Sequence, residues 1–448
     1  MTDVLEIEGP PKRAAGWALA LIGVALIVHA LMMGSLFWGY LDPLFDNSNV
    51  HEQGVDFFSI YEAGHRALEG GSVYFTDPDI SPVVPYSSLY RYVPGFAYVF
   101  ALPPNALHIG AWTAYWSWVT LYELLLILNA YATWRLGGRT TWAAIGAAMW
   151  FVFSPFYLEQ YMGQFSFLMA TLLLWTGAGA VHGRELLAGP PWVVSLVIKS
   201  SSALLAPLFL RLRWWRSLIA GAVLGGLSLV YFLWRPDDWE IFWVANTGVL
   251  GESTVRATYF NPGDLGAVSL LRNSILAFDA DAQSVSTVYL EALAYTVIGV
   301  SLVATFWPRR IDPLAVFAMW VASFFLVYTV WEHHYVMLLP ALVLLVIFRP
   351  SLRPLALVAF FFIAVPTPYW LMENVWNTGP ISTLNQYQSH QEMWPAWGVI
   401  TQHAIKVVPV ALLWGWLAGS QLRNGVWLPR SSLLRLRRGT RPATIELG

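Results

Sequence analysis

Stretches of twenty or more residues in this chain carry no charged side chain, and no other feature limits its fold as strongly. About 20 apolar residues are enough to cross a bilayer as a helix. Only 12% of the 448 residues are charged, whereas an ordinary soluble domain has about 25%. A water-soluble enzyme is therefore excluded. The sequence predicts an all-α polytopic membrane protein with a single integral membrane domain over residues 1–448.

We predict about twelve transmembrane helices, each spanning roughly 17–25 residues where the apolar run is long enough. Two short ones should form a hairpin between Arg184 and Arg211 with Lys199 at its outer tip, because one crossing cannot keep both basic flanks inside. The short apolar run 335–348 is counted as a further crossing. The long apolar runs lie near residues 14–38, 108–134, 140–158, 163–182, 217–234, 286–307, 313–331, 354–372 and 399–419.

The distribution of basic residues predicts the orientation. With both termini cytoplasmic, the cytoplasmic segments hold 18 of the 25 lysine and arginine residues, as the positive-inside rule requires. The first run lacks a cleavage pattern and should be a retained helix. The basic tail, about 420–448, should lie on an anionic inner leaflet. The outer loops, about 39–91, 235–285 and 373–398, are long and should carry interfacial helices and the functional site.

The first outer loop contains an amphipathic helical pattern that begins near Asp56. Apolar positions recur from Phe57 to Leu68, and Glu62 and Arg66 are spaced to pair on one face. Asp56 has two interpretations. It could only cap this helix, as aspartates often do, or it could be a carboxylate held at the membrane surface to take a proton from a substrate hydroxyl.

Other polar residues are expected at the same outer face. Gln164 begins a span, Lys199 lies at the hairpin tip, and Glu332, His333 and His334 occupy a tight turn between two apolar runs. Helix capping, snorkelling of the lysine or a wet loop would also explain them, but ionisable groups at this depth are often functional. Arg272 from the second outer loop would complete a basic pocket suited to a phosphate.

Several kinds of chemistry have no support in the sequence. The chain has no cysteine and no HExxH, GxxxxGK[ST] or GxGxxG pattern, so neither a zinc site nor a nucleotide-phosphate loop is indicated. Closely spaced outer carboxylates such as Asp279 and Asp281 resemble a solvated loop more than a Mg²⁺ site. We expect no metal. Two mid-span residues, His29 and Glu123, could relay protons, but a hydrogen bond between neighbouring helices is the favoured interpretation.

Passages along most of the chain resemble motifs of glycosyltransferase family 87, the polyprenyl-phosphate-mannose-dependent α-mannosyltransferases of the C-type multispan superfamily. They are DFFSIYEAG at 56–64, GQFS at 163–166, Lys199 in its hairpin, WEHHYVMLLP at 331–340 and, more loosely, YFNPGDLGAVSLLR at 259–272. Two departures stand out. Ser166 replaces the usual asparagine, and Ser200, Ser201 and Ser202 follow the lysine, with Pro207 arriving late.

The resemblance implies an inverting glycosyltransferase at the extracytoplasmic face of the plasma membrane. It would transfer a hexose, mannose in the family, from a polyprenyl-phosphate-sugar donor to a lipid- or glycan-linked acceptor. Asp56 would be the general base, and Lys199, Arg272 and one of His333 and His334 would stabilise the leaving phosphate.

The same resemblance implies substrate contacts for the motif residues Gln164, Arg91, Tyr61 and Asn261. Arg91 precedes an apolar stretch, YVPGFAYVFALPP, that is too short to cross and should be re-entrant or interfacial. Apart from the lipid-linked donor no cofactor is implied. The expected partners are membrane lipid, donor and acceptor, and nucleic acid is not among them.

Three other functions are compatible with parts of the pattern. A lipid-linked oligosaccharide polymerase or ligase also has long outer loops, but more often arginine-rich ones. A secondary transporter would place its ionisable residues at the bilayer midplane in two related halves. A binding or assembly protein without catalysis is the third.

Overall fold

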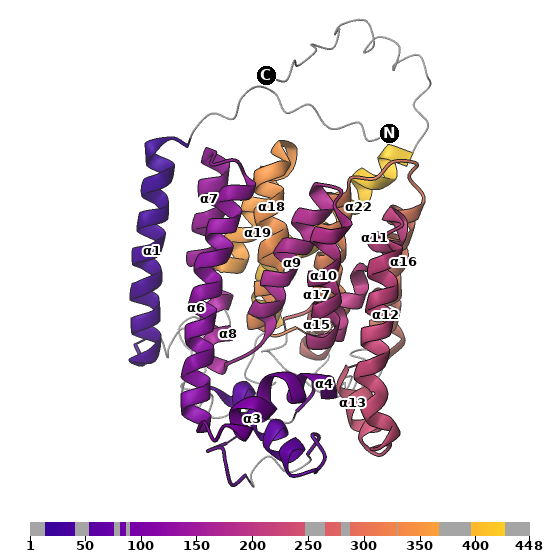
Figure 1. Ribbon diagram of the computed structural model, residues 1–448. Coiled ribbons are helices and arrows are strands. Elements are labelled where there is room, and N and C mark those ends of the chain that lie inside the picture. Colours follow the sequence, from indigo (N-terminus) through magenta and orange to yellow (C-terminus); the bar gives the residue numbers. More distant parts are fainter. Residues whose placement is uncertain are drawn as a thin grey trace, which may run out of the picture.

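The computed structural model describes residues 14–40, 53–75, 81–86, 90–246, 265–278, 287–328, 330–366 and 396–425. Every regular element in these ranges is helical, which confirms the predicted all-α class. Long helices run roughly side by side, and the shorter α3, α4 and α13 gather at one end of the bundle (Figure 1). Much of the three predicted outer loops and the basic tail beyond residue 425 lies outside the described residues.

The first half of the chain forms helices that lead from α1 to the Lys199 hairpin. They are α1 (Gly16–Phe37), α3 (Val55–Leu68), α4 (Pro94–Phe96), the π-helix η1 (Ala97–Ala101), α5 (Leu102–Ala106), α6 (Ala111–Leu136), α7 (Thr141–Phe151), α8 (Ser154–Met162), α9 (Ser166–Val181), α10 (Glu185–Ile198), the 3₁₀-helix η2 (Ser200–Leu205) and α11 (Ala206–Leu212).

The second half of the chain completes the bundle. Its helices are α12 (Trp215–Leu229), η3 (Val230–Leu233), α13 (Asp238–Asn246), α15 (Ala267–Phe278), α16 (Thr287–Phe306), α17 (Pro313–Val327), η5 (Glu332–Leu338), α18 (Leu339–Phe348), η6 (Pro350–Leu352), α19 (Arg353–Ala364) and α22 (Ala396–Gly425).

The described residues contain five helices that are long and apolar enough to cross a membrane, so the predicted number of about twelve is not confirmed. They are Gly16–Phe37, Thr141–Met162, Trp215–Leu233, Val288–Phe306 and Ile400–Arg423. Most other predicted spans form apolar helices of only 10–17 residues. Two of these, α17 and α18, are almost entirely buried. Protein rather than lipid surrounds them, which relaxes the length that a lipid-exposed helix needs.

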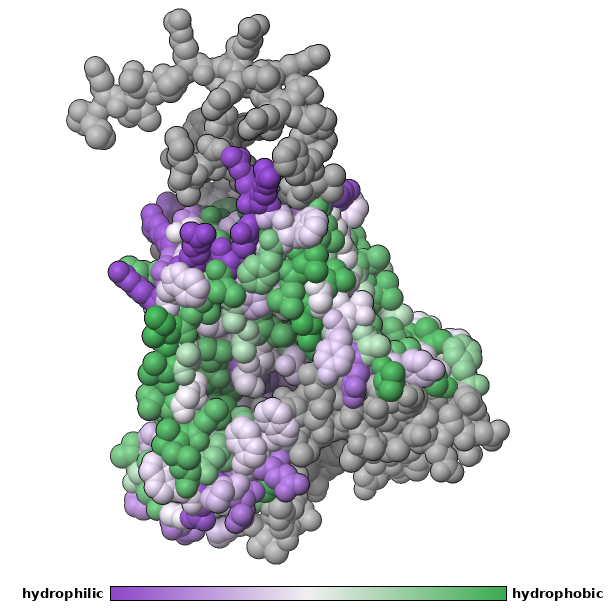
Figure 2. Space-filling model, turned by 90° about the vertical axis from the view of Figure 1, so that its right-hand side faces the viewer, coloured by the Kyte–Doolittle hydropathy of each residue, from purple (hydrophilic) through white to green (hydrophobic). Residues whose placement is uncertain are grey.

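The outer surface of the bundle is apolar where lipid would contact it. Helices α1, α6 and α12 expose large side chains such as Ile27, Leu124 and Ile219. Figure 2 shows hydrophobic side chains over the middle of one face and hydrophilic ones gathered at its upper end. The start of α1 and the end of α22 also lie at this end, opposite α3 (Figure 1).

The predicted hairpin around Lys199 is present. The chain leaves α10 at Ile198, turns at Lys199 and returns through η2 and α11. The Trp192 indole donates a hydrogen bond of 2.9 Å to the Ser202 carbonyl and stacks on Phe209 with ring centroids 4.2 Å apart. These contacts join the two arms and fix the position of the lysine between them.

Helix α3 packs against the segment α4–η1–α5 at the end of the bundle. The approach is closest at Gly64, where a Cβ atom would lie 2.4 Å from the backbone carbon of Ala101. A side chain there would separate the two elements, which explains the glycine in the DFFSIYEAG passage. The segment itself consists of three short helical pieces; its re-entrant or interfacial position stays a prediction.

Candidate active site

The centre of the site is the turn from Gly163 to Ser166, which connects α8 to α9. Gly163 ends α8 in the left-handed conformation, with φ of 71°. A Cβ atom on it would lie 2.5 Å from the Cβ of Phe57. Glycine is therefore required both by the backbone conformation and by the contact with the start of α3. This packing places the turn against the residue before Phe57, Asp56.

Gln164 connects this turn to Asp56. Its Nε2 donates a hydrogen bond of 2.5 Å to Asp56 Oδ2, and its Oε1 accepts one of 2.7 Å from the Tyr92 hydroxyl. The assignment of the amide oxygen and nitrogen agrees with both partners, because a carboxylate can only accept. Gln164 thus fixes the orientation of the Asp56 carboxylate in a half-buried position.

Asp56 does not cap α3, so the capping interpretation is wrong. The N-cap residue is Gly54, which has φ of 76° and makes no side-chain cap, and Asp56 lies in the first turn. A carboxylate there still interacts favourably with the helix dipole, which favours its ionised form. The predicted pair of Glu62 and Arg66 is confirmed, with Nε and Oε1 2.8 Å apart.

Lys199 meets the same turn from the other side. Its Nζ donates a hydrogen bond of 2.6 Å to Ser166 Oγ and lies 5.9 Å from the centre of the Tyr92 ring. Asp56 and a second carboxylate, Glu159, interact electrostatically with it. Ser166, the departure from the family motif, is therefore the direct partner of the lysine.

Two residues of this cluster were not predicted from the sequence. Burial raises the pKa of the Tyr92 phenol far above its ordinary value, and the Asp56 and Glu159 carboxylates raise it further. Tyr92 therefore stays protonated and donates to Gln164. Glu159 is fully buried in α8; its Oε1 accepts a hydrogen bond of 2.7 Å from the Phe167 amide, and its Oε2 has no partner among the described residues. The signal that could have found Glu159 is that it is a single carboxylate within an apolar run of the sequence.

The histidine pair lies in η5 and completes the group of residues around Lys199. The rings of His333 and His334 are 4.3 Å apart, and both interact electrostatically with Lys199. His334 Nδ1 accepts a hydrogen bond of 3.1 Å from the Trp331 amide. His333 is buried, and neither of its ring nitrogens has a hydrogen-bond partner among the described residues. Of the two histidines, His333 is therefore the one whose ring nitrogens can form hydrogen bonds with a substrate.

Arg272 lies in a second polar cluster, which joins α15 to α22. Its Nε donates a hydrogen bond of 3.0 Å to Asn273 Oδ1, and Asn273 Nδ2 lies 2.9 Å from His403 Nε2. Nearby on α22, Lys406 pairs with Glu332 at 3.0 Å. All of these side chains are buried. Arg272 and the histidine segment are thus both held by α22, and no described contact joins Arg272 to Lys199.

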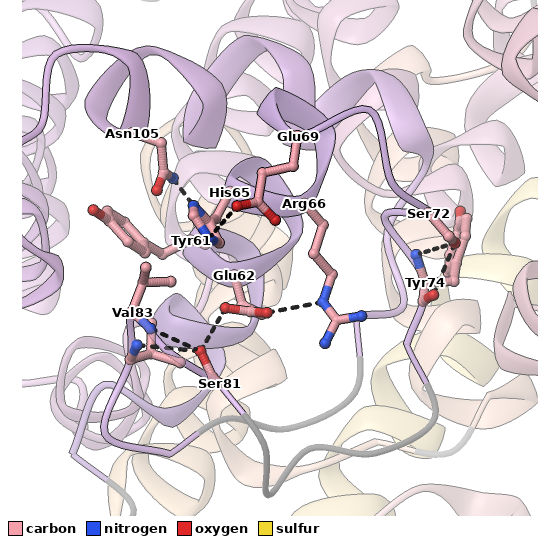
Figure 3. A network of polar contacts seen from close by, with 11 residues as sticks. Tyr61, Glu62, His65, Arg66, Glu69, Ser72, Tyr74, Ser81, Val83 and Asn105 are labelled. Carbon is pink, nitrogen blue, oxygen red and sulfur yellow. Dashed lines mark hydrogen bonds and ion pairs between the residues drawn. The ribbon is translucent and has the colours of Figure 1, made fainter.

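Two of the predicted substrate contacts, Tyr61 and Arg91, make no described hydrogen bond to the residues of this cluster. The Tyr61 hydroxyl donates to the Ile109 carbonyl at 2.7 Å instead, and Arg91 is exposed beside Tyr92. Asn261 lies outside the described residues. Tyr61 belongs to the contacts that hold α3 in place, shown in Figure 3. There Asn105 donates to the Tyr61 carbonyl at 2.9 Å.

The polar mid-span residues form a separate structural network. His29 Nε2 lies 2.9 Å from Glu123 Oε2, and Gln160 donates to Glu123 Oε1 at 2.9 Å. Helices α1, α6 and α8 are joined in this way, which confirms the packing interpretation. No group of three or more metal-ligating side chains occurs in the part of the chain that the structure describes.

Comparison with known families gives one result. The family model described as glycosyltransferase family 87 matches residues 90–340, which is more than half of the chain. The matched region contains Gln164, Lys199, Arg272 and the histidine pair, whereas Asp56 and α22 lie outside it. A comparison with curated proteins finds no match.

Proposed function

The chain belongs to glycosyltransferase family 87, and from this premise we propose that it transfers a hexose from a polyprenyl-phosphate-sugar to a lipid- or glycan-linked acceptor. The resemblance of the motifs favours mannose. The reaction takes place at the extracytoplasmic face of the plasma membrane, with both termini cytoplasmic. The asymmetric distribution of lysine and arginine supports this sidedness. So does the position of α3 at the end of the bundle opposite the start of α1 and the end of α22.

One observation carries the proposal. The turn at 163–166 holds a carboxylate through Gln164 and a cation through Ser166, only two residues apart in sequence. A transferase needs these two groups on opposite sides of the reacting carbon. The carboxylate accepts the proton of the attacking hydroxyl, and the cation stabilises the departing anion.

In the proposed step the acceptor oxygen attacks the anomeric carbon from the face opposite the phosphate. The new C–O bond forms as the bond to the phosphate oxygen breaks, and the configuration inverts through an oxocarbenium-like state. The hydroxyl proton moves to Asp56, and the electron pair of the broken bond leaves with the polyprenyl phosphate. Asp56 is favoured as the base because Gln164 orients its carboxylate through a single hydrogen bond to Oδ2.

The leaving phosphate is assigned to Lys199, His333 and Arg272. The half-buried side chain of Lys199 supplies a positive charge beside the turn. The ring nitrogens of buried His333, which have no hydrogen-bond partner in the described part of the chain, supply donors or acceptors for a phosphate. A monophosphate needs less neutralisation than the diphosphate of a nucleotide-sugar, so these groups suffice without a metal ion. Arg272, in the polar cluster that joins α15 to α22, is proposed to add a second positive charge for the phosphate.

The test uses purified protein in nanodiscs with radiolabelled polyprenyl-phosphate-mannose and a membrane lipid extract as the acceptor source. We expect label to enter the glycolipid fraction, and GDP-mannose to give none. Asp56→Asn should lower the rate by at least about 10²-fold, as the loss of an acid or base group does. The matched control is Asp237→Asn, at an exposed position near the start of α13.

Two results would contradict the proposal. Near-normal turnover by Asp56→Asn would remove Asp56 from the role of base. Counterflow uptake of the donor into liposomes without any sugar transfer would indicate a transporter instead.

A further inference from the structure

An apolar cavity of about 220 Å³ is lined in part by α3, the helix that carries Asp56, and by no residue of the hairpin that carries Lys199. Its walls come from α3, from η1 and α5, from α6, and from Phe165. The lining includes Phe57 and Phe165, which directly follow Asp56 and Gln164 in sequence. Residues next in sequence to both members of the hydrogen-bonded pair of Asp56 and Gln164 therefore line the cavity.

The chemistry of the cavity suits a hydrocarbon and not a sugar. Most of its lining is aromatic or aliphatic. The polar groups among the lining residues already have partners: the Tyr61 hydroxyl donates to Ile109, Trp118 Nε1 to Gln164, and Ser117 to Thr113. A hexose would leave its hydroxyls without hydrogen bonds there. A dry apolar cavity of about 150 Å³ is already large enough to bind benzene.

The cavity opens to the surface of the bundle through α6. Ser117 and Leu121 line it and are exposed, whereas Ile60 and Phe165 deeper inside are buried. These exposed positions lie on the same lipid-facing helix as Leu124. An alkyl chain can therefore enter sideways from the membrane, without passing through the polar site.

The walls are joined before any ligand binds. Asn105 Nδ2 donates to the Tyr61 carbonyl at 2.9 Å, which ties α5 to α3 (Figure 3). The same nitrogen donates to the Ala101 carbonyl of η1 at 2.8 Å. The opening between these elements and α6 is therefore part of the fold and does not need a ligand to form it.

We propose that this cavity binds an acyl chain of the acceptor, so that the acceptor is a membrane glycolipid of the outer leaflet. The inference rests on the proposed role of Asp56 as the base. The acceptor hydroxyl must reach Asp56, and the helix that carries Asp56 forms one wall of the cavity. The proposed phosphate ligands come from α10–η2, η5 and α15, which do not line the cavity. The donor's polyprenyl chain therefore enters elsewhere.

The test is photolabelling in nanodiscs, which requires no turnover. One arm uses phosphatidylglycerol with a diazirine in an acyl chain, and the other uses a diazirine-bearing polyprenyl phosphate. Readout is restricted to labels on the buried stretch 57–64 of α3, which is out of reach of bulk lipid, because Leu68 at the end of the same helix is exposed. We expect the acyl probe to label this stretch and the polyprenyl probe not to label it.

Ser117→Phe should fill the mouth of the cavity and lower acyl labelling of residues 57–64 about tenfold. Thr120→Phe is the matched control, because Thr120 is also exposed on α6, also donates to the carbonyl four residues before it, and does not line the cavity. Its labelling should match that of the unmodified chain.

Labelling of this stretch by the polyprenyl probe, no labelling by either probe, or equal labelling in Ser117→Phe would each overturn the inference. Asp56→Asn should keep its labelling. Full activity of that variant together with normal acyl labelling would refute the role of the base while leaving the lipid site intact, so the two failures are distinguishable.

Discussion

The buried ion pair between Glu332 and Lys406 makes a strong prediction about stability. The two side chains are 3% and 0% exposed, and Lys406 Nζ lies 3.0 Å from Glu332 Oε1. The ammonium also donates to the carbonyls of Ile363, at 2.7 Å, and Val365. The lysine thus connects α22 to the end of α19 and to the start of η5. Lys406→Met removes this connection.

The magnitude follows from the burial. Removing one partner of a buried pair costs about 3–5 kcal/mol, since the other charge is left without compensation, whereas replacing both by apolar residues is often neutral. We therefore expect Lys406→Met to lower the free energy of unfolding by about 3–5 kcal/mol. Adding Glu332→Met should restore about 2 kcal/mol or more of that loss, within the range of coupling between contacting residues.

The assay is unfolding in bicelles by steric trapping, which gives a free energy for each variant. Val408→Met, at a lipid-exposed position on the same helix, should change it by less than about 0.5 kcal/mol. The reasoning is refuted if the double variant is as unstable as Lys406→Met, or if the single variant unfolds like the unmodified chain.

Further predictions concern the turn and the donor. Gly163→Ala should lower the transfer rate at least about tenfold without preventing folding, since its methyl group would displace Phe57 and with it Asp56; an unchanged rate would mean that the turn does not position the base. Lys199→Ala should weaken binding of polyprenyl phosphate measured by native mass spectrometry more than binding of the acceptor, and the reverse order would exchange the two assignments. Transfer should proceed at an unchanged rate in excess EDTA, and a loss that Mg²⁺ or Mn²⁺ restores would show that a metal ion shares the role given to the cations.

Local patterns predicted much of this fold. Uncharged apolar runs became helices, and the spacing of Glu62 and Arg66 gave a real ion pair. Basic residues on both flanks predicted a hairpin that turns at Lys199. The number of crossings could not be predicted in this way, because hydropathy does not distinguish a helix surrounded by protein, such as α18, from one surrounded by lipid.

Site residues could be predicted from the sequence where a polar residue interrupts or borders an apolar run. They could not be predicted where their position depends on contacts between residues far apart in the sequence. Gln164 and Lys199 were noticed as polar groups near the ends of apolar runs. The capping role of Asp56 failed because Gly54, two residues earlier, adopts the left-handed conformation and starts the helix. The contacts that hold Arg272 depend on His403, which is 130 positions from Asn273, and no local pattern predicts such a pairing.

The shared turn of Gln164 and Ser166 has a thermodynamic consequence. One rigid four-residue segment contacts both the base and the cation, so a displacement of the segment by a ligand on one side changes the site on the other. Such coupling between binding free energies is reciprocal. If phosphate at Lys199 shifts this segment and changes the affinity for the acceptor by some factor, then the acceptor changes the affinity for the donor by the same factor. Four residues of backbone would then make the binding of either substrate depend equally on the presence of the other.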